Sequence, residues 1–274
     1  MSHKDPMGDR LKLLEKFGTE HRAMPQLPLC VRLDGRAFHT YTKNMNHPFD
    51  DVMSSAMDTA TIRLVSEFKP VIGYTQSDEI TLVFYNEPDP AKNPSEFLFG
   101  GKFHKINSVL ASTAAVEFYR AIIAQMPEMA GTIPSFDCRT WSVPSKTEAV
   151  NTLLWRWFDA KKNSVSTLAQ HHFSHKKLHK MGISDMHDLL LSIGVDWNAL
   201  PTRHKWGAFF RRESVMRSLS EEELSRIPEK HRPSGPVMRT MLKRVEIGRF
   251  DKAEDRMSLI FGDTFKDSLE HVDG

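Results

Sequence analysis

Two β-rich runs joined by a short polar segment restrict most what this chain can fold into. Residues 71–74 and 80–85 are rich in Val, Ile, Tyr and Phe, and Thr75-Gln76-Ser77-Asp78-Glu79 lies between them. This pattern is typical of a β-hairpin. Because a hairpin pairs its strands antiparallel, we expect a largely antiparallel sheet with polar residues at the hairpin tip.

Strand and helix patterns on both sides of the hairpin complete an α/β order. Apolar residues at helical spacing fill residues 52–68, and Lys69-Pro70 ends that run. We also expect strands at residues 27–33 and 133–143 and a long helix at residues 103–125. This order predicts an α/β fold of the α+β kind, with a largely antiparallel sheet and helices on one of its faces.

The second half of the chain is expected to be mainly helical. Ser145 and Glu148 have the spacing of a capping box, which opens a helix predicted to run to about residue 169. Further patterns predict helices at residues 184–193 and 220–226 and strands at residues 206–212 and 237–247. We therefore divide the chain into residues 1–143 and a C-terminal region, residues 144–274, which forms a second lobe or further helices on the same body.

Composition excludes several classes of protein. Of the 274 residues, 40% are hydrophobic and 26% are charged, a balance typical of globular proteins. No window approaches the ~20 apolar residues that span a bilayer, and the charged N-terminus lacks the apolar core of a signal peptide. We expect a cytoplasmic protein without a membrane partner. Cys30 and Cys138 are too few for a disulfide framework, and a net charge of +2 neither favours nor opposes nucleic acid.

Carboxylates occur where two of the predicted strands end. The apolar run 27–33 is followed by Asp34-Gly35-Arg36, and Asp78 lies at the hairpin tip. If Asp34 and Asp78 lie on neighbouring strands, their oxygens form a site for one or two Mg²⁺ ions that hold a triphosphate. Taken alone, an Asp-Gly pair is more often an ordinary turn. Because both segments occur together, two interpretations stay open: ordinary turns, or a site for phosphoryl-transfer chemistry.

Several motifs occur in an order that resembles a known enzyme family. They are RLDGRAFH at residues 32–39, PFD at 48–50, GYTQSDE at 73–79, Lys105 followed by Ser108 and Ser112, and FDCR at 136–139. Together they resemble the tRNA-histidine guanylyltransferase family, including its guanylyltransferase-like members, over about residues 28–215. The resemblance implies a palm-like catalytic sheet in residues 1–143, as in polymerases and nucleotidyl cyclases.

The resemblance also implies a reaction. Members of the family add nucleotides to the 5′ end of tRNA, in the direction opposite to ordinary polymerases. A 5′-monophosphate is first activated, typically with ATP, and the 3′-hydroxyl of an incoming nucleoside triphosphate, such as GTP, then attacks the activated phosphate. Catalysis of such transfers depends mainly on positioning and charge stabilisation.

Site residues follow from the matching motifs. Two Mg²⁺ ions are expected on the side chains of Asp34 and Asp78, which are the catalytic residues, and on the carbonyl of Gly35. Nucleotide contacts are expected from Arg36, Ala37, Phe38, His39, Ser77 and Lys105. The position of His39 directly after the Asp-Gly-Arg turn favours nucleotide contact over packing.

Two departures from the family pattern bear on the type of reaction. His47 stands where many members have Lys. Members that add an extra guanosine carry a His-Ile-Asn-Asn motif, and here Lys161 and Ser164 replace its His and last Asn, while Asn163 is kept. Such variation resembles the members that act as template-dependent 3′–5′ polymerases and repair truncated tRNA. The resemblance therefore favours 5′-end repair, with obligatory guanosine addition to tRNA-histidine as the alternative.

Basic residues gather after residue 160. Residues 160–183 contain no acid but several Lys and His residues, so this segment is either a solvated surface or an RNA contact. Given the motif match, we expect RNA contacts at Lys102, Arg139, Asp159, Lys161, Lys162 and Asn163. The spacing of His171, His175 and His179 would align them for zinc on an unbroken helix. Ser174 is a candidate start of a new helix, and no Cys or carboxylate nearby completes a ligand set, so a polar or RNA-facing surface is favoured. Trp155, Trp157 and Phe158 are adjacent aromatics, for which packing is favoured over base stacking.

Two other functions remain open from the sequence. A nucleotidyl cyclase would use the same two aspartates without an RNA surface, and the acid-free segment 160–183 argues against it. A non-catalytic RNA-binding protein is disfavoured because both Asp34 and Asp78 are present. The expected partners are tRNA, nucleoside triphosphates and further copies of the chain, in a dimer or tetramer.

Overall fold

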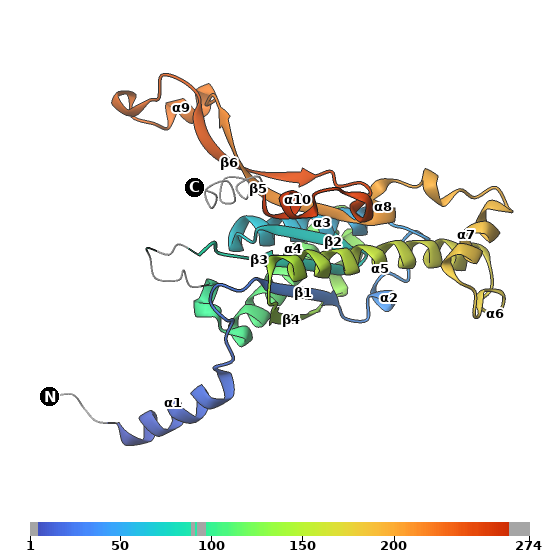
Figure 1. Cartoon of the computed structure of the whole chain (residues 1–274), viewed down its shortest axis with the longest axis horizontal. Coiled ribbons are helices and arrows are strands. Elements are labelled where there is room, and N and C mark those ends of the chain that lie inside the picture. The colour runs from blue at the N-terminus through green and yellow to red at the C-terminus, as the bar shows by residue number, and fades with distance from the viewer. Residues whose placement is uncertain (1–4, 89–90, 92–96, 263–274) are drawn as a thin grey trace, which may run out of the picture.

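A six-stranded antiparallel sheet forms the centre of the computed structural model, which describes residues 5–88, 91 and 97–262 (Figure 1). Its strands follow the spatial order β4-β1-β3-β2-β5-β6. They are β1 (Leu29–Gly35), β2 (Ile72–Gln76), β3 (Glu79–Phe84), β4 (Phe136–Ser142), β5 (Ala208–Arg217) and β6 (Val237–Val245). All neighbouring strands pair antiparallel. The predicted hairpin, now β2–β3, and the predicted fold class are confirmed.

Helices follow the capping signals in the sequence. The Asp50 carboxylate accepts a hydrogen bond from the Met53 amide at 2.8 Å and opens α3, and Lys69 ends that helix in a left-handed conformation before Pro70. Ser145 opens α5 by accepting a hydrogen bond from the Glu148 amide at 3.2 Å. The helices are α1 (Pro6–Thr19), α2 (Phe38–Tyr41), α3 (Asp51–Phe68), α4 (Phe103–Gln125), α5 (Lys146–His172), α6 (His175–Leu178), α7 (Ile183–Leu191), α8 (Thr202–Trp206), α9 (Glu221–Ser225) and α10 (Arg256–Phe261).

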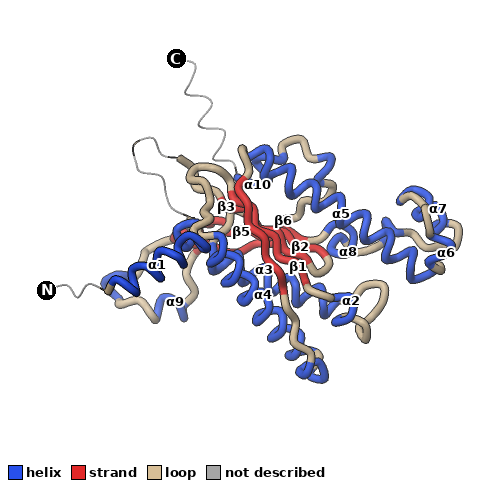
Figure 2. The backbone as a smooth tube through the Cα atoms, turned by 90° about the horizontal axis from the view of Figure 1, so that it is seen from below, coloured by secondary structure: helices blue, strands red, loops and turns tan. Residues whose placement is uncertain are grey.

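Both faces of the sheet are covered, which corrects the expectation of helices on one face. Side chains alternate along β1: Val31 and Leu33 belong to the core shared with α3 and α4, whereas Cys30 belongs to the core shared with α5 and α10. Figure 2 shows the strands between these two groups of helices. The physical reason is that the central strands are apolar on both sides, and an apolar second face needs its own cover.

The second half of the chain is built onto the same body. β5 pairs with β2, so the region after residue 144 supplies strands as well as helices to the sheet. The division of the chain at residue 143 stays a prediction. A third core of α5, α6 and α7 extends beyond the sheet (Figure 1). Among the described residues, no helix is both long and apolar enough to cross a membrane.

Candidate active site

The register of β1 and β3 brings Asp34 and Asp78 to the same end of the sheet. Asp34 pairs with Glu79, and the Gly35 amide donates a hydrogen bond to the Asp78 carbonyl at 3.0 Å. Burial raises the pKa of the Asp78 carboxyl, and the charge of Asp34 raises it further. Two carboxylates that repel each other at a partly buried site are stabilised by a divalent cation, for which their oxygens are suitable ligands.

A third acid, Glu79, is occupied by an arginine of α5. The guanidinium of Arg156 donates to Glu79 from Nε at 2.7 Å and from Nη2 at 2.5 Å, and to the Asp159 carboxylate from Nη1 at 2.7 Å. Burial raises the pKa of Glu79, and the Arg156 charge opposes that shift. Through this ion pair, Glu79 holds α5 against the sheet next to Asp34. Asp159, which is expected to contact RNA, instead forms an ion pair with Arg156.

The turn after β1 is held by an aromatic anchor. Phe38 is buried, and its ring centre lies 5.1 Å from that of Phe136 and 5.3 Å from that of Phe118. A side chain at Gly35 would overlap the Phe38 ring, so this position requires glycine. The Arg36 amide donates to the Ser135 carbonyl at 2.9 Å. The backbone amides that this turn offers a ligand are consequently those of residues 37–39.

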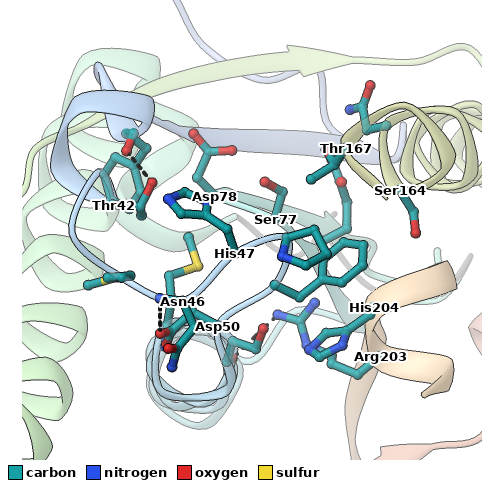
Figure 3. Close-up of a pocket in the computed structure, with 18 of the residues that line it drawn as sticks. Thr42, Asn46, His47, Asp50, Ser77, Asp78, Ser164, Thr167, Arg203 and His204 are labelled. Carbon is teal, nitrogen blue, oxygen red and sulfur yellow. Dashed lines mark hydrogen bonds between the residues drawn. The ribbon is translucent and has the colours of Figure 1, made fainter. Parts of the chain in front are cut away.

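A cavity of about 490 Å³ reaches Asp78, which is one of its lining residues (Figure 3). The residues that line it come from α2, the following loop, the start of α3, the hairpin tip, α5 and the segment around α8. Asp50 shapes the loop, because its second carboxylate oxygen accepts a hydrogen bond from the Asn46 amide at 2.9 Å. Figure 3 shows Ser77 and Asp78 at one side of this space and Arg203 and His204 at another. The expected site residues Phe38, His39, Ser77, Asp78 and Asn163 line the cavity.

Other expected residues lie outside this cavity. The Lys105 ammonium lies 5.0 Å from the centre of the Phe99 ring, and Arg139 on β4 pairs with Asp137 at 3.0 Å. Lys102 precedes α4 and pairs with Arg22 in an isolated bridge. Lys162 is exposed on α5, while the charge of the half-buried Lys161 acts on Asp251.

Several site residues escaped the sequence analysis. Arg156 had no signal beyond its place between two tryptophans. Arg203 and His204 stand out only as part of a basic run, yet both line the cavity. Arg203 donates to Asp58 at 2.8 Å, and the His204 ring stacks on Phe49 with centres 4.8 Å apart. Burial lowers the pKa of His204, an effect that Asp51 opposes.

The oxygen ligands for a metal are few. Within the described residues, no group of three or more His, Cys, Asp or Glu side chains is arranged to hold a metal ion. The expected set differs in kind, since it combines two carboxylates with the Gly35 carbonyl. Such hard oxygen donors fit Mg²⁺, which is commonly bound by one or two carboxylates together with substrate phosphates.

Comparison with known proteins identifies the family. The sequence pattern of the family described as Thg1, tRNAHis guanylyltransferase, matches residues 9–144. A bacterial tRNA(His) guanylyltransferase (Thg1)-like protein, solved in complex with ATP, is 33% identical, with a TM-score of 0.69 over 75% of this chain and 88% of that one. This chain belongs to the tRNA(His) guanylyltransferase family.

Two further proteins are similar to this guanylyltransferase-family chain over most of its length. A bacterial Thg1-like protein in complex with GTP has a TM-score of 0.70 and 27% identity, and the match covers 94% of this chain and 100% of that one. An uncharacterized protein of Acanthamoeba polyphaga mimivirus is 31% identical over 231 residues, 77% of this chain and 78% of that one. Enzymes of the family are nucleotidyltransferases that act on tRNA, and membership confirms the predicted enzyme class.

Proposed function

We propose that this enzyme is a Mg²⁺-dependent nucleotidyltransferase that adds nucleotides to the 5′ end of tRNA and repairs truncated ends. The observation that carries the proposal is that Asp34, near the end of β1, lies beside Asp78, which is in the turn before β3 and lines a cavity of about 490 Å³. Nucleotide transfer needs both parts: a charge site for phosphates and a recess for a nucleoside.

The metal ions in this proposal are held by Asp34, Asp78 and the Gly35 carbonyl. Bound there, Mg²⁺ neutralises phosphate charge and favours attack by a hydroxyl. The chain itself positions the triphosphate through the backbone at residues 37–39 and through Ser77. Arg36 contributes its side chain, because its amide is bonded to Ser135. Lys105 adds positive charge from the start of α4.

The nucleoside of the bound triphosphate occupies the cavity. Its lining combines apolar surfaces, such as Phe49 and Met53, with polar groups such as Thr42 and Asn46. Two similar bacterial proteins were solved with ATP and with GTP. We therefore infer that both ATP and GTP are substrates here, ATP for activation of a 5′-monophosphate and GTP for addition.

Repair is favoured over obligatory guanosine addition by the α5 motif. The Ser164 hydroxyl, in place of an Asn, accepts a hydrogen bond from the Trp197 indole at 2.9 Å and so joins α5 to Trp197 within the third core. Lys161 stands in place of the motif's His. Obligatory addition of guanosine to tRNA-histidine remains the alternative, since it uses the same metal site.

RNA binding, assembly and location complete the proposal. Lys102, Arg139 and Lys162 supply exposed or half-exposed positive charge for tRNA phosphates. A homo-oligomer, dimer or tetramer, is supported by α1, whose Leu11, Leu14 and Phe17 are all exposed. We place the enzyme in the cytoplasm.

The deciding experiment offers the purified protein two kinds of tRNA transcript, full-length and 5′-truncated, with each nucleoside triphosphate supplied separately. Products labelled at the 3′ end are resolved by length. Repair predicts that truncated transcripts are extended with the nucleotide complementary to the opposite strand. Guanosine added to full-length tRNA-histidine, whatever the opposing base, supports the alternative. A protein that extends neither transcript in the presence of Mg²⁺ contradicts the proposal.

A further inference from the structure

Trp155 of α5 is an aromatic residue that packing does not explain. Its neighbour Trp157 is buried at 1% exposure and stacks on Trp206, with ring centres 4.5 Å apart. Trp155, by contrast, is 52% exposed. A half-exposed tryptophan gains little stabilisation from burial of its large apolar surface. Exposed aromatic side chains beside a site commonly bind ligands.

The Trp155 indole lies next to the proposed metal site. The guanidinium carbon of Arg32 is 5.9 Å from the centre of the indole, and that of Arg156 is 4.6 Å away. Arg32 precedes Asp34 by two residues in β1, so both side chains point to the same face of the sheet. Arg156 binds Glu79, which is the residue paired with Asp34. The indole therefore borders the end of the sheet where Asp34 lies.

One of these arginines has an unused donor. The Nε atom of Arg32 is buried and has no hydrogen-bond partner among the described residues. The carboxylate oxygen of Glu79 that lies toward it is 3.9 Å away, which is beyond hydrogen-bond distance. Since the side chains of Arg32 and Arg156 are themselves largely buried, they lie on the protein side of the indole. Its exposed side faces away from them.

We propose that Trp155 stacks on the terminal base of the RNA whose 5′ phosphate reacts. This inference rests on the proposed function. The reacting phosphate must lie at Asp34 and Asp78, so the base of the same nucleotide lies within one nucleotide's length of them. A base at an RNA end has one face without a stacking neighbour, and aromatic side chains accept such faces irrespective of base identity. The charge of Arg32 behind the ring favours the adjoining phosphate.

The test places the fluorescent base 2-aminopurine at the 5′ terminus of a truncated tRNA transcript. Stacking on an indole quenches this base, so the intact protein should quench it on binding. Trp155→Leu, which keeps apolar bulk, and Trp155→Ala should both lose the quenching and raise the KM for RNA about 10-fold. Trp155→Phe should retain most of both. The KM for nucleoside triphosphate should stay within about twofold, because Trp155 does not line the cavity.

A matched control and a size measurement make the result decisive. Ile193→Ala removes an apolar side chain that is 48% exposed after α7 and should change neither quenching nor KM. Unchanged quenching in Trp155→Leu and Trp155→Ala would overturn the inference. A changed oligomeric mass with unchanged quenching would also overturn it and make Trp155 a subunit contact. Wild-type protein that quenches the base but adds no nucleotide contradicts the proposed function and leaves the stacking role supported.

Discussion

At the scale of single residues, the adjacent acids Asp78 and Glu79 have different surroundings. Glu79 faces Arg156, which is 77 positions away in the sequence and neutralises it. Asp78 faces Asp34, and no positively charged side chain contributes to the shift of its pKa. Burial and repulsion by Asp34 raise that pKa, whereas hydrogen bonds from the backbone and from Ser77 lower it. The sequence shows that both acids stand at a hairpin tip. It does not show which one is neutralised, because that depends on where α5 docks.

The first prediction concerns Asp78→Ala. Loss of one of two proposed metal ligands should lower nucleotide addition by about 10³-fold, since the metal supplies several kcal/mol of charge stabilisation. Binding of tRNA should stay within about twofold, because other residues make those contacts. Product formation by gel and tRNA affinity by filter binding measure the two quantities. Asp188→Ala, which removes a side chain 76% exposed on α7, is the control. Equal losses of binding and activity would contradict the metal role.

The second prediction concerns the buried pair Arg156–Glu79. Arg156→Ala leaves the Glu79 carboxylate buried without its main partner, and this should lower the free energy of unfolding by about 3–5 kcal/mol near pH 7.5. In this variant burial raises the pKa of Glu79 without opposition from Arg156. A raised folded-state pKa means that the stability deficit is largest at high pH and shrinks as the pH falls and Glu79 takes up a proton.

Urea denaturation of wild type and Arg156→Ala at pH 5.5 and 8 measures this difference. Adding Glu79→Gln to the variant should recover part of the stability at pH 8, because the unpaired charge is gone. Arg226→Ala breaks an ion pair that is about three-quarters exposed and should cost at most about 1 kcal/mol. A deficit in Arg156→Ala that is the same at both pH values would show that lost packing, rather than the buried charge, is its cause.

At the scale of elements, the sequence predicts the individual helices and strands better than it predicts how they pack against one another. The hairpin, the long helices and the strands at residues 27–33 and 237–247 were predicted because spacing, caps and turn residues act within one element. The placement of α5 on the second face of the sheet was not predicted. It depends on an apolar surface that Cys30, Tyr74 and Val83 form across three strands. The loop between α2 and α3, which shapes the cavity, has no periodic pattern to predict it.

The junction of α8 and β5 gives the third prediction. Gly207 has a φ of 76°, and a Cβ atom there would overlap the Thr75 carbonyl oxygen of β2. Gly207→Ala should therefore force β5 away from β2 and lower stability by more than about 2 kcal/mol. Gly194 is the matched control, because its φ is 80° but nothing lies within 4 Å of an added Cβ. Gly194→Ala should cost only about 1 kcal/mol. Thermal denaturation of the two variants measures the loss of stability in each. Equal losses would mean that the positive φ alone, and not the overlap with Thr75, causes the destabilisation.

At the scale of the whole molecule, the candidate site joins both halves of the chain. Asp78 and the loop before α3 line the cavity from the first half, in which Asp34 also lies, whereas Asn163, Arg203 and His204 line it from the second half. The motif match singles out residues of the first half because they are local to strand ends, and their roles stay predictions. Those of the second half depend on α5 and α8 folding back over the sheet, which the sequence does not reveal. One consequence is that α5 has one side that lines the cavity and another side that is exposed.

The fourth prediction tests whether that exposed side of α5 binds RNA. Lys162 is exposed, whereas Lys161 is half-buried and its charge acts on Asp251. Lys162→Ala should therefore weaken tRNA binding more than Lys161→Ala, and it should reduce the slope of log affinity against log salt by about 1. Filter binding at several salt concentrations measures this slope. Lys12→Ala, on the exposed helix α1, is the control and should leave the slope unchanged. If both α5 variants keep the wild-type affinity and slope, α5 does not contact the RNA backbone, and the other basic residues, Lys102 and Arg139, would have to carry that role.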